Sequence, residues 1–329
     1  MAETNTSPGR VCPLRYRYGA RALATAPTRQ ADTLYVIGGL YGNIPALDAV
    51  EALANAEATR PTLCFNGDFN WFNIADETFA EINTRVLQHD AIVGNVEAEF
   101  DPDNASDDAG CGCAYPDNVD ARIVERSNQI HAQLKATARR HPALAARIAR
   151  LPMFARYQVG DCRIAVVHGD ADSLAGWRFD VDSLDDASAL PWLQSAFAEA
   201  QVDLFASTHT CLPAMRNFTL NAEGNATGFV VNNGAAGMPN FAPDAASSSA
   251  TNHLFGVCTR ISTKPSPHEA IHEFHHAGVY VALLPIRYDH ARWAAQFVKQ
   301  WPPGSAAHES YFQRISAGTN FARRRAHAL

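Results

Sequence analysis

Short β-branched runs alternate with helical patterns through the first half of the chain, and this alternation limits the possible folds more than any other feature. It is typical of βαβ units, in which helices cover a layered sheet. The first expected strands are Thr33 to Ile37, Thr62 to Phe65 and Ala91 to Val93. The helices expected between them are Ile44 to Ala56 and Ile74 to Gln88. We therefore predict a layered α/β fold.

The second half of the chain continues this alternation after a polar insertion. Residues 101–117 are rich in Gly and Asp, and helical patterns follow at 120–139 and 143–151. We predict that residues 101–151 form a helical cap beside the sheet. The remaining expected strands are 155–159, 163–167, 204–206, 228–231, 256–262 and 279–287, and the remaining expected helices are 190–200 and 290–300.

The chain has 329 residues, enough for one large α/β domain or two small ones. No Gly/Ser-rich or Pro-rich linker divides it. We therefore predict a single domain over residues 31–329, preceded by a flexible N-terminal extension over residues 1–30. That first stretch contains no uninterrupted apolar h-region, so a secretory signal is not expected. No window approaches about 18 consecutive apolar residues, so no membrane-spanning helix is expected.

The cysteine content and the net charge limit the cellular compartment and the classes of partner that we expect. Seven cysteines are an odd number for a disulfide framework, and their scatter suits a reducing compartment. A cytoplasmic protein with free thiols is therefore expected. The net charge of −7 argues against the basic stripe that binding to a phosphate backbone requires. Neither nucleic acid nor membrane is an expected partner.

Five short polar motifs fall where the expected strands end, which is the edge at which open α/β sheets bind ligands. The motifs are GGLYGN at 38–43, NGDFN at 66–70, GNVE at 94–97, VHGD at 167–170 and THTC at 208–211. A sixth segment, NNGAAG at 232–237, supplies small residues and backbone amides for a tight turn. The sequence therefore predicts that the candidate functional residues lie at one edge of the fold.

Taken in order, these motifs resemble those of the calcineurin-like metallophosphoesterases, whose pattern is DxH, GDxxD, GNH[DE], H and GHxH. The resemblance extends from about Leu34 to Asp289. It implies the fold of that family, a β-sandwich of mixed sheets flanked by helices, here with a helical cap insertion. It also implies a metal-dependent hydrolase that acts on phosphate esters.

The family binds two metals, and the ligands of one of them are all present. The bridging aspartate corresponds to Asp68, and the other three ligands correspond to Asn95, His168 and His209. This mixed set of oxygen and nitrogen ligands suits Mn²⁺, Fe²⁺ or Zn²⁺ better than it suits a closed structural zinc site. The resemblance thus implies one divalent transition metal, held by these four residues.

In this chain, other residues stand at the positions that bind the family's second metal. It takes the DxH pair and the last histidine of GHxH, and this chain has Gly39, Tyr41 and Cys211 at those positions. Glycine offers no ligand atom. A Cys211 thiolate would rebuild part of the site, whereas a free cysteine is more often a small buried apolar residue. A mononuclear site is therefore expected, with Cys211 as a candidate additional ligand.

Two further departures bear on mechanism. The histidine that assists the leaving group in GNH[DE] is replaced by Val96, although Glu97 keeps the acidic position after it. Trp71 stands at the second aspartate of GDxxD. A single metal still lowers the pKa of a bound water and polarises a phosphoryl oxygen. Tyr41 is the nearest candidate for a replacement acid.

Three residues near the motifs are candidates for orienting a substrate. They are Asn43 and Asn70, which lie within the first two motifs, and Arg178, which follows the fourth. Arginine forks well onto phosphate or carboxylate. The alternative for Arg178 is a surface salt bridge.

Two other motifs have less demanding explanations. HEFHH at 272–276 satisfies the HExxH pattern of zinc proteases, which requires a helix. Its flanks, Pro265 and Pro267 before and Gly278 after, indicate a loop and a strand. Cys111 and Cys113 form a CxC pair without a second pair, so a structured loop near the pocket is favoured over a metal or redox site.

Two functions from different classes fit these observations. The first is a metal-dependent hydrolase of a small phosphate monoester or diester, whose partner is a small phosphorylated substrate. The second is a catalytically inactive protein of the same fold that binds or regulates through its pocket. The loss of the DxH ligands favours the second function, and the intact set of four ligands favours the first.

Overall fold

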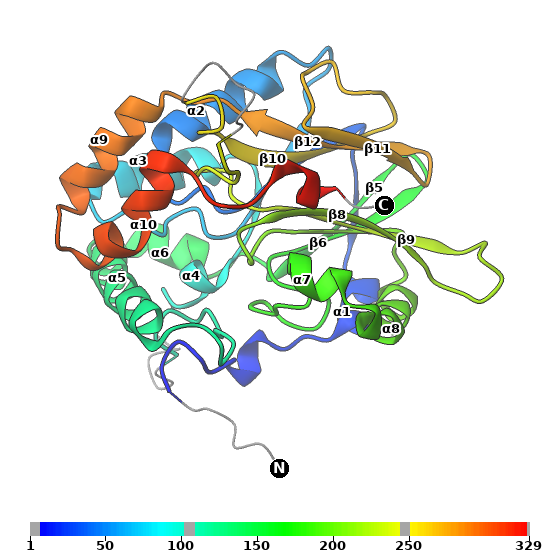
Figure 1. The fold of residues 1–329 in the computed structure, drawn as a ribbon, viewed down its shortest axis with the longest axis horizontal. Coiled ribbons are helices and arrows are strands. Elements are labelled where there is room, and N and C mark those ends of the chain that lie inside the picture. The colour runs from blue at the N-terminus through cyan, green and yellow to red at the C-terminus, as the bar shows by residue number, and fades with distance from the viewer. Residues whose placement is uncertain (1–6, 102–108, 244–250, 328–329) are drawn as a thin grey trace.

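The computed structural model describes residues 7–101, 109–243 and 251–327, and two six-stranded mixed sheets lie within them (Figure 1). Strand β2 (Thr33–Ile37) is buried along its whole length. Its alternate side chains serve two cores: Leu34 and Val36 pack in one, and Tyr35 and Ile37 pack in the other. Successive side chains of a strand point to opposite faces, so burial of both faces explains the uninterrupted apolar run.

The first sheet, called sheet I, has the strand order β1-β5-β6-β7-β9-β8. Strands β6, β7 and β9 are parallel, while β5 and β8 pair antiparallel to their neighbours β6 and β9. Its strands are β1 (Thr28–Gln30), β5 (Phe154–Val159), β6 (Cys162–Val167), β7 (Leu204–Ser207), β8 (Pro213–Thr219) and β9 (Thr227–Asn233).

The second sheet, called sheet II, has the strand order β11-β12-β10-β2-β3-β4. Strands β2, β3 and β4 are parallel, and the other half of the sheet is antiparallel. Its remaining strands are β3 (Thr62–Asn66), β4 (Asp90–Ile92), β10 (Gly256–Ser262), β11 (His272–His276) and β12 (Val279–Ile286). The two sheets share an apolar core, to which β6 contributes Ile164 and β10 contributes Ile261.

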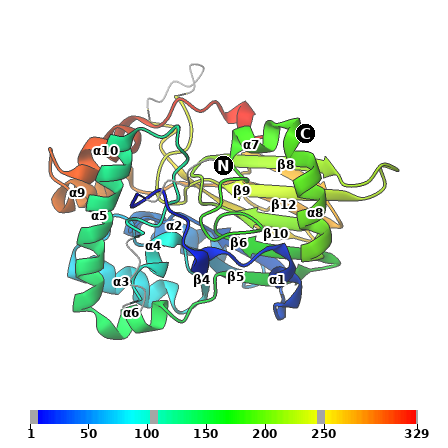
Figure 2. The same ribbon diagram turned by 90° about the horizontal axis from the view of Figure 1, so that it is seen from below.

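Helices cover the outer faces of this sandwich (Figures 1 and 2). Those beside sheet I are α1 (Ala20–Thr25), α7 (Val181–Asp185) and α8 (Leu190–Ala200). The others are α2 (Ile44–Asn55), α3 (Asp76–Val86), α4 (Asn95–Ala98), α5 (Ala121–Arg140), α6 (Pro142–Ile148), α9 (His290–Gln300) and α10 (Ala306–Ala317). Figure 2 shows α5, α9 and α10 gathered on the side of the molecule away from β8 and β9. None of the helices described combines the length and apolar character needed to cross a bilayer.

The predicted fold class is confirmed, and the boundaries of the predicted elements differ by a few residues at most. Strands β2 and β10 and helices α8 and α9 match their predicted bounds. The seven cysteines are free, as expected. Helices α5 and α6 follow the polar insertion; α5 packs on α10 and α3, and α6 packs on α3 and α5. The segment 102–108 of the predicted cap lies outside the described residues.

The segment before residue 31 departs from its prediction. Within residues 7–30, α1 packs against α8, and β1 forms a parallel edge of sheet I by pairing Thr28 with Arg156. Tyr16 and Leu23 are buried. The prediction of a flexible extension is therefore wrong for residues 7–30, because apolar side chains spaced among the arginines contribute to the cores.

The HExxH segment forms strand β11 at the edge of sheet II. Its side chains alternate between the two faces, and His276 is buried where its Nε2 lies 2.9 Å from the Asp203 carbonyl oxygen. Zinc binding by an HExxH motif requires a helix, which places the two histidines on one face with the glutamate as base. The segment from His272 to His276 is a strand and does not have that arrangement. The protease interpretation is therefore excluded, as the flanking residues indicated.

Candidate metal centre

The carboxyl ends of parallel strands from both sheets meet at one edge, and four polar side chains converge there. Asp68 follows β3, and Asn95 begins α4 after β4. His168 follows β6, and His209 follows β7. All four are buried, with at most 6% of each residue exposed. The fold thus brings together the four residues that the sequence proposed as ligands.

Nε2 of His168 lies at the centre of this cluster. It is 3.4 Å from Oδ1 of Asp68, 3.2 Å from Oδ1 of Asn95 and 3.2 Å from Nδ1 of His209. A metal held tetrahedrally at about 2.0–2.2 Å would separate its ligand atoms by roughly 3.3–3.6 Å. The three distances to Nε2 of His168 are close to that range, and the ligand atoms of Asp68, His168 and His209 all lie within 4.8 Å of one another, so these residues could hold one divalent metal.

Backbone carbonyls orient both histidine rings for this role. Nδ1 of His168 lies 2.8 Å from the Asn66 carbonyl oxygen, and Nε2 of His209 lies 3.2 Å from the Cys113 carbonyl oxygen. A ring that donates its N–H to a carbonyl leaves a lone pair on its other nitrogen. The lone pairs of His168 Nε2 and His209 Nδ1 then face each other at 3.2 Å. Such a buried pair of acceptors requires a cation or a proton between them.

The CxC loop also sets the orientation of the asparagine. Nδ2 of Asn95 donates to the Cys111 carbonyl oxygen at 2.9 Å, which turns Oδ1 toward His168. Cys111 and Cys113 therefore act through their backbone oxygens, on Asn95 and on His209. Sequence reasoning placed this loop near the pocket but missed its orienting role, because backbone carbonyls leave no signal in residue identity.

Charges within the cluster shift its ionisation. Burial raises the pKa of Asp68, but the facing His168 and His209 outweigh burial and leave the pKa below its usual range. Burial and the neighbouring His168 lower the pKa of His209 to about 3. Asp68 is therefore ionised and His209 neutral near neutral pH, which are the states that metal ligands require.

Metal affinity is expected to fall as the pH is lowered, because protons compete for His168. Burial lowers the pKa of His168, but the Asp68 carboxylate outweighs burial and raises this pKa above 6.5. Below its raised pKa, metal-free His168 is protonated and each bound metal releases that proton. The affinity should then drop by about tenfold per pH unit. Calorimetric titration with Zn²⁺ from about pH 8 to about pH 5.5 measures this slope, and a flat profile would contradict it.

Glu97 supports the cluster through hydrogen bonds to backbone N–H groups, and it is not among the described residues that line the pocket. Its carboxylate accepts hydrogen bonds from the backbone N–H groups of Asp68 at 2.8 Å, Asn70 at 3.1 Å and Gly94 at 3.2 Å. Burial and the negative charge of Asp68 raise the pKa of Glu97 to about 7. Asp68 itself has a φ of 52°, a left-handed conformation that is costly for a residue with a side chain. Glu97 is thus a positioning residue that holds this turn.

Gly39, Tyr41 and Cys211, the three residues that the motif resemblance aligns with ligands of a second metal, lie close to one another. A Cβ atom added to Gly39 would lie 2.8 Å from both Cζ and Oη of Tyr41, so the tyrosine ring covers the place of an aspartate side chain. Oη of Tyr41 lies 2.9 Å from Sγ of Cys211, and burial raises the pKa of that thiol. Sγ of Cys211 is not among the donor atoms that cluster within 4.8 Å of one another in the described residues. The structure therefore does not bring Cys211 to the metal cluster.

The three residues predicted to orient a substrate have structural partners. For Asn43 the expected group is its backbone amide, and that N–H donates to the Leu40 carbonyl oxygen at 3.1 Å. Asn43 caps α2 by accepting from the N–H of Ala46, and it also donates to the Gly237 carbonyl oxygen. Nδ2 of Asn70 donates to Asn83 and Glu97 beneath the site. Asn43, Asn70 and Arg178 are absent from the lining of the pocket in the part of the chain described.

Arg178 lies on the surface. Its guanidinium is 3.4 Å from Asp172 and stacks over the ring of Trp192 at 4.7 Å. This is the salt-bridge alternative.

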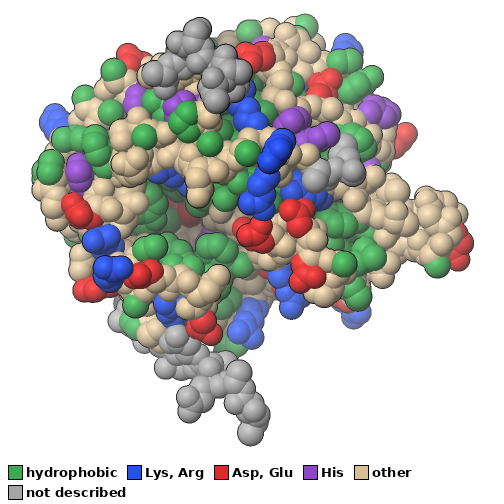
Figure 3. Space-filling view, viewed as in Figure 1, with side chains coloured by type: hydrophobic (Ala, Val, Ile, Leu, Met, Phe, Trp, Pro, Cys, Tyr) green, Lys and Arg blue, Asp and Glu red, His purple; other side chains and the backbone are tan. Residues whose placement is uncertain are grey.

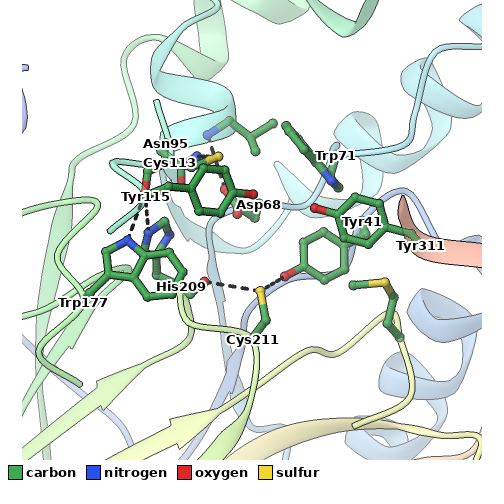
Figure 4. Close-up of a pocket in the computed structure, with 12 residues that line it drawn as sticks. Tyr41, Asp68, Trp71, Asn95, Cys113, Tyr115, Trp177, His209, Cys211 and Tyr311 are labelled. Atoms are coloured by element: carbon green, nitrogen blue, oxygen red, sulfur yellow. Dashed lines mark hydrogen bonds between the residues drawn. The ribbon is translucent and has the colours of Figure 1, made fainter. Parts of the chain in front are cut away.

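A cavity of about 60 Å³ opens beside the cluster, with room for a few water molecules. Figure 3 shows this face of the molecule hollowed near its middle, with hydrophobic side chains bordering the hollow. Aromatic rings and sulfur atoms form most of the cavity wall around Asp68 (Figure 4). The lining residues are Tyr41, Asp68, Trp71, Asn95, Val96, Cys113, Tyr115, Trp177, His209, Cys211, Met238 and Tyr311.

Comparison with known proteins finds similar solved structures. No family model matches the sequence, and no curated protein matches it significantly. A metallophosphoesterase from Sphaerobacter thermophilus is similar over 87% of this chain and 100% of its own, at 16% identity and a TM-score of 0.49. A hypothetical protein from Pyrococcus horikoshii OT3 is similar over 89% of this chain and 100% of its own, at 13% identity and a TM-score of 0.53.

Likeness at these identities is a likeness of fold, and it agrees with the architecture. Two six-stranded mixed sheets are flanked by helices within the described residues, and the motif loops gather at one edge of both sheets. This chain therefore shares its fold with the Pyrococcus horikoshii protein.

Proposed function

We propose that this chain is a metal-dependent hydrolase of a small phosphate monoester or diester that works with a single metal. The observation that carries the proposal is the cluster of Asp68, Asn95, His168 and His209, whose donor atoms meet around Nε2 of His168. Mn²⁺, Fe²⁺ or Zn²⁺ fits these oxygen and nitrogen donors. When bound, such a metal supplies an activated water and polarises a phosphoryl oxygen.

The protein's own groups have distinct parts in this proposal. The walls of the cavity keep most water away from the cluster, which strengthens the electrostatic interactions inside it. Tyr41 lines the cavity, and burial raises its pKa well above 10, so its hydroxyl stays protonated. That hydroxyl can therefore donate a hydrogen bond to a substrate oxygen, where the family uses the histidine that Val96 replaces.

One observation favours a second candidate function. Gly39, Tyr41 and Cys211 stand where the motif resemblance places ligands of a second metal, so half of the two-metal clamp of the family is missing. A protein that binds a metal or a phosphate group in this pocket without hydrolysis would have the same structure. The two functions differ in turnover and not in geometry.

Turnover of chromogenic phosphoesters separates these two functions. Protein loaded in turn with Mn²⁺, Fe²⁺ or Zn²⁺ is expected to hydrolyse 4-nitrophenyl phosphate or bis(4-nitrophenyl) phosphate, and His209→Ala is expected to lose at least about 100-fold of that rate. Cys258→Ser, at a buried cysteine in sheet II, is the control for a changed core residue. Bound metal without turnover of either ester would refute the hydrolase and support the binding protein.

A further inference from the structure

Aromatic side chains form most of the rim and floor of the cavity. Trp71 is buried in the floor, while Tyr115, Trp177 and Tyr311 are half-buried at the rim. Figure 4 shows these rings around the carboxylate of Asp68. Nε1 of Trp177 and Oη of Tyr115 are already hydrogen-bonded to protein, so these two rings offer a ligand mainly their apolar faces and edges.

Two of these rings are held rigidly beside a candidate ligand. Nε1 of Trp177 donates to the Cys113 carbonyl oxygen at 3.0 Å, and its ring meets the ring of His209 at a centroid distance of 5.2 Å. Oη of Tyr115 lies 3.1 Å from Oγ of Ser127, and its ring lies 5.9 Å from that of Trp177. A ligand group that leaves the cluster along this side therefore meets a prearranged aromatic wall.

The cavity offers no cationic side chain to a substrate. Among the lining residues described, His209 is the only basic one, and both of its ring nitrogens face protein atoms: Nε2 lies 3.2 Å from the Cys113 carbonyl oxygen, and Nδ1 lies 3.2 Å from Nε2 of His168. The guanidinium of Arg314 lies behind the wall, where it donates to the carbonyl oxygens of Pro239 and Cys211. The one carboxylate among the lining residues described is that of Asp68, which lies within the cluster.

We propose that the substrate is a phosphate diester with at least one flat aromatic ester group, which lies against Trp177 and Tyr115. This inference rests on the proposed function and narrows its substrate class. A diester has one negative charge, whereas a monoester approaches two near neutral pH. One divalent cation beside Asp68 leaves a net charge of about +1, which balances the diester without the arginine or lysine that a dianion would need.

The size of the cavity fits this arrangement. Its volume of about 60 Å³ is well below the roughly 150 Å³ that encloses a benzene ring. The phosphoryl group alone can therefore enter the cavity, and an aromatic ester group must lie on the rim. Stacking of a ring on a fixed aromatic side chain favours binding of aryl and nucleobase groups without strong preference among them.

A set of four slowly reacting ligands tests the two parts of the inference independently of turnover. Calorimetric titration of the metal-loaded protein would compare diphenyl phosphate, diethyl phosphate, phenyl phosphate and inorganic phosphate. We expect diphenyl phosphate to bind at least about tenfold more tightly than diethyl phosphate, which has the same charge and no ring. We expect it also to bind more tightly than phenyl phosphate, which has a ring and a greater charge.

A matched pair of tryptophan variants locates the ring. Trp177→Leu should remove most of the advantage of diphenyl over diethyl phosphate, whereas Trp192→Leu should retain it. Trp192 is likewise half-buried and donates its Nε1–H to a neighbouring oxygen, here of Asp172, but it lies outside the cavity lining. The order of the ligand affinities on the unaltered protein tests the proposal even if a variant fails to fold.

Each contrary outcome would overturn one named part of the proposal. Equal binding of diethyl and diphenyl phosphate would overturn the aromatic contact, and tighter binding of phenyl phosphate would overturn the diester. Hydrolysis of 4-nitrophenyl phosphate in preference to the bis ester would overturn the substrate class while leaving the hydrolase in place. Metal-loaded protein that hydrolyses neither ester would instead contradict the proposed function.

Discussion

His168→Ala should reduce the metal content of the purified protein from about one equivalent to less than about a tenth of that value. Nε2 of His168 lies within 3.4 Å of donor atoms from Asp68, Asn95 and His209, so its removal opens the centre of the cluster. The remaining ligands are buried and cannot swing to replace it. Asp68→Ala should have the same effect, because it removes the only negative charge among the four ligands.

Elemental analysis of protein purified without chelator measures this loss. Cys211→Ser is the matched control. The sulfur of Cys211 is hydrogen-bonded to Tyr41 beside the cluster, so it should be dispensable for metal binding. Metal retained in full by His168→Ala would contradict the site. Two equivalents in the unaltered protein, with one lost in Cys211→Ser, would mean that this cysteine rebuilds a second site.

Glu97→Ala should destabilise the metal-free protein by about 3–5 kcal/mol. The carboxylate of Glu97 accepts from the backbone N–H groups of Asp68, Asn70 and Gly94, all of which are buried. Alanine would leave three donors without a partner, and each unsatisfied buried donor costs about 1–3 kcal/mol before water enters the gap. The left-handed turn at Asp68 would also lose its support, since its φ of 52° is unfavourable by itself.

Urea unfolding in the presence of a chelator isolates this effect from metal binding. Glu97→Gln serves as the comparison, because its amide oxygen still accepts from the N–H groups on one side while its NH₂ cannot accept. It should therefore lose clearly less stability than Glu97→Ala. A loss below about 1 kcal/mol in Glu97→Ala would show that water or a shifted backbone satisfies these donors.

Much of the sheet core could be predicted from local pattern. Strand β2 and strand β10 appear as apolar runs because both of their faces are buried, and this requirement is visible in the residues themselves. Strand β8 was missed, because Pro213 to Thr219 alternates buried and exposed positions only in part and begins with proline. The ordered segment within residues 7–30 was also missed, since its short apolar spacing lies among arginines.

The side chains of the candidate site were predictable where residue type implies chemistry. An aspartate, an asparagine and two histidines follow strand ends, and the resemblance of their motifs to those of the calcineurin-like metallophosphoesterases implied a ligand set. Asn43, Asn70 and Arg178 were interpreted as substrate-binding residues from proximity in sequence alone. Their actual partners, Gly237, Glu97 and Asp172, show that proximity does not determine which way a side chain turns.

The sequence by itself determined the α/β class, the strand-end position of the four ligands and the absence of an aspartate at Gly39, because each depends on residue identity and local pattern. Only the tertiary structure decided that the ring of Tyr41 packs over Gly39 and that its hydroxyl contacts Cys211. It also decided that the carbonyls of the CxC loop orient the ligands. These contacts join segments far apart in the chain through backbone atoms and packing, which every residue type shares and no motif encodes.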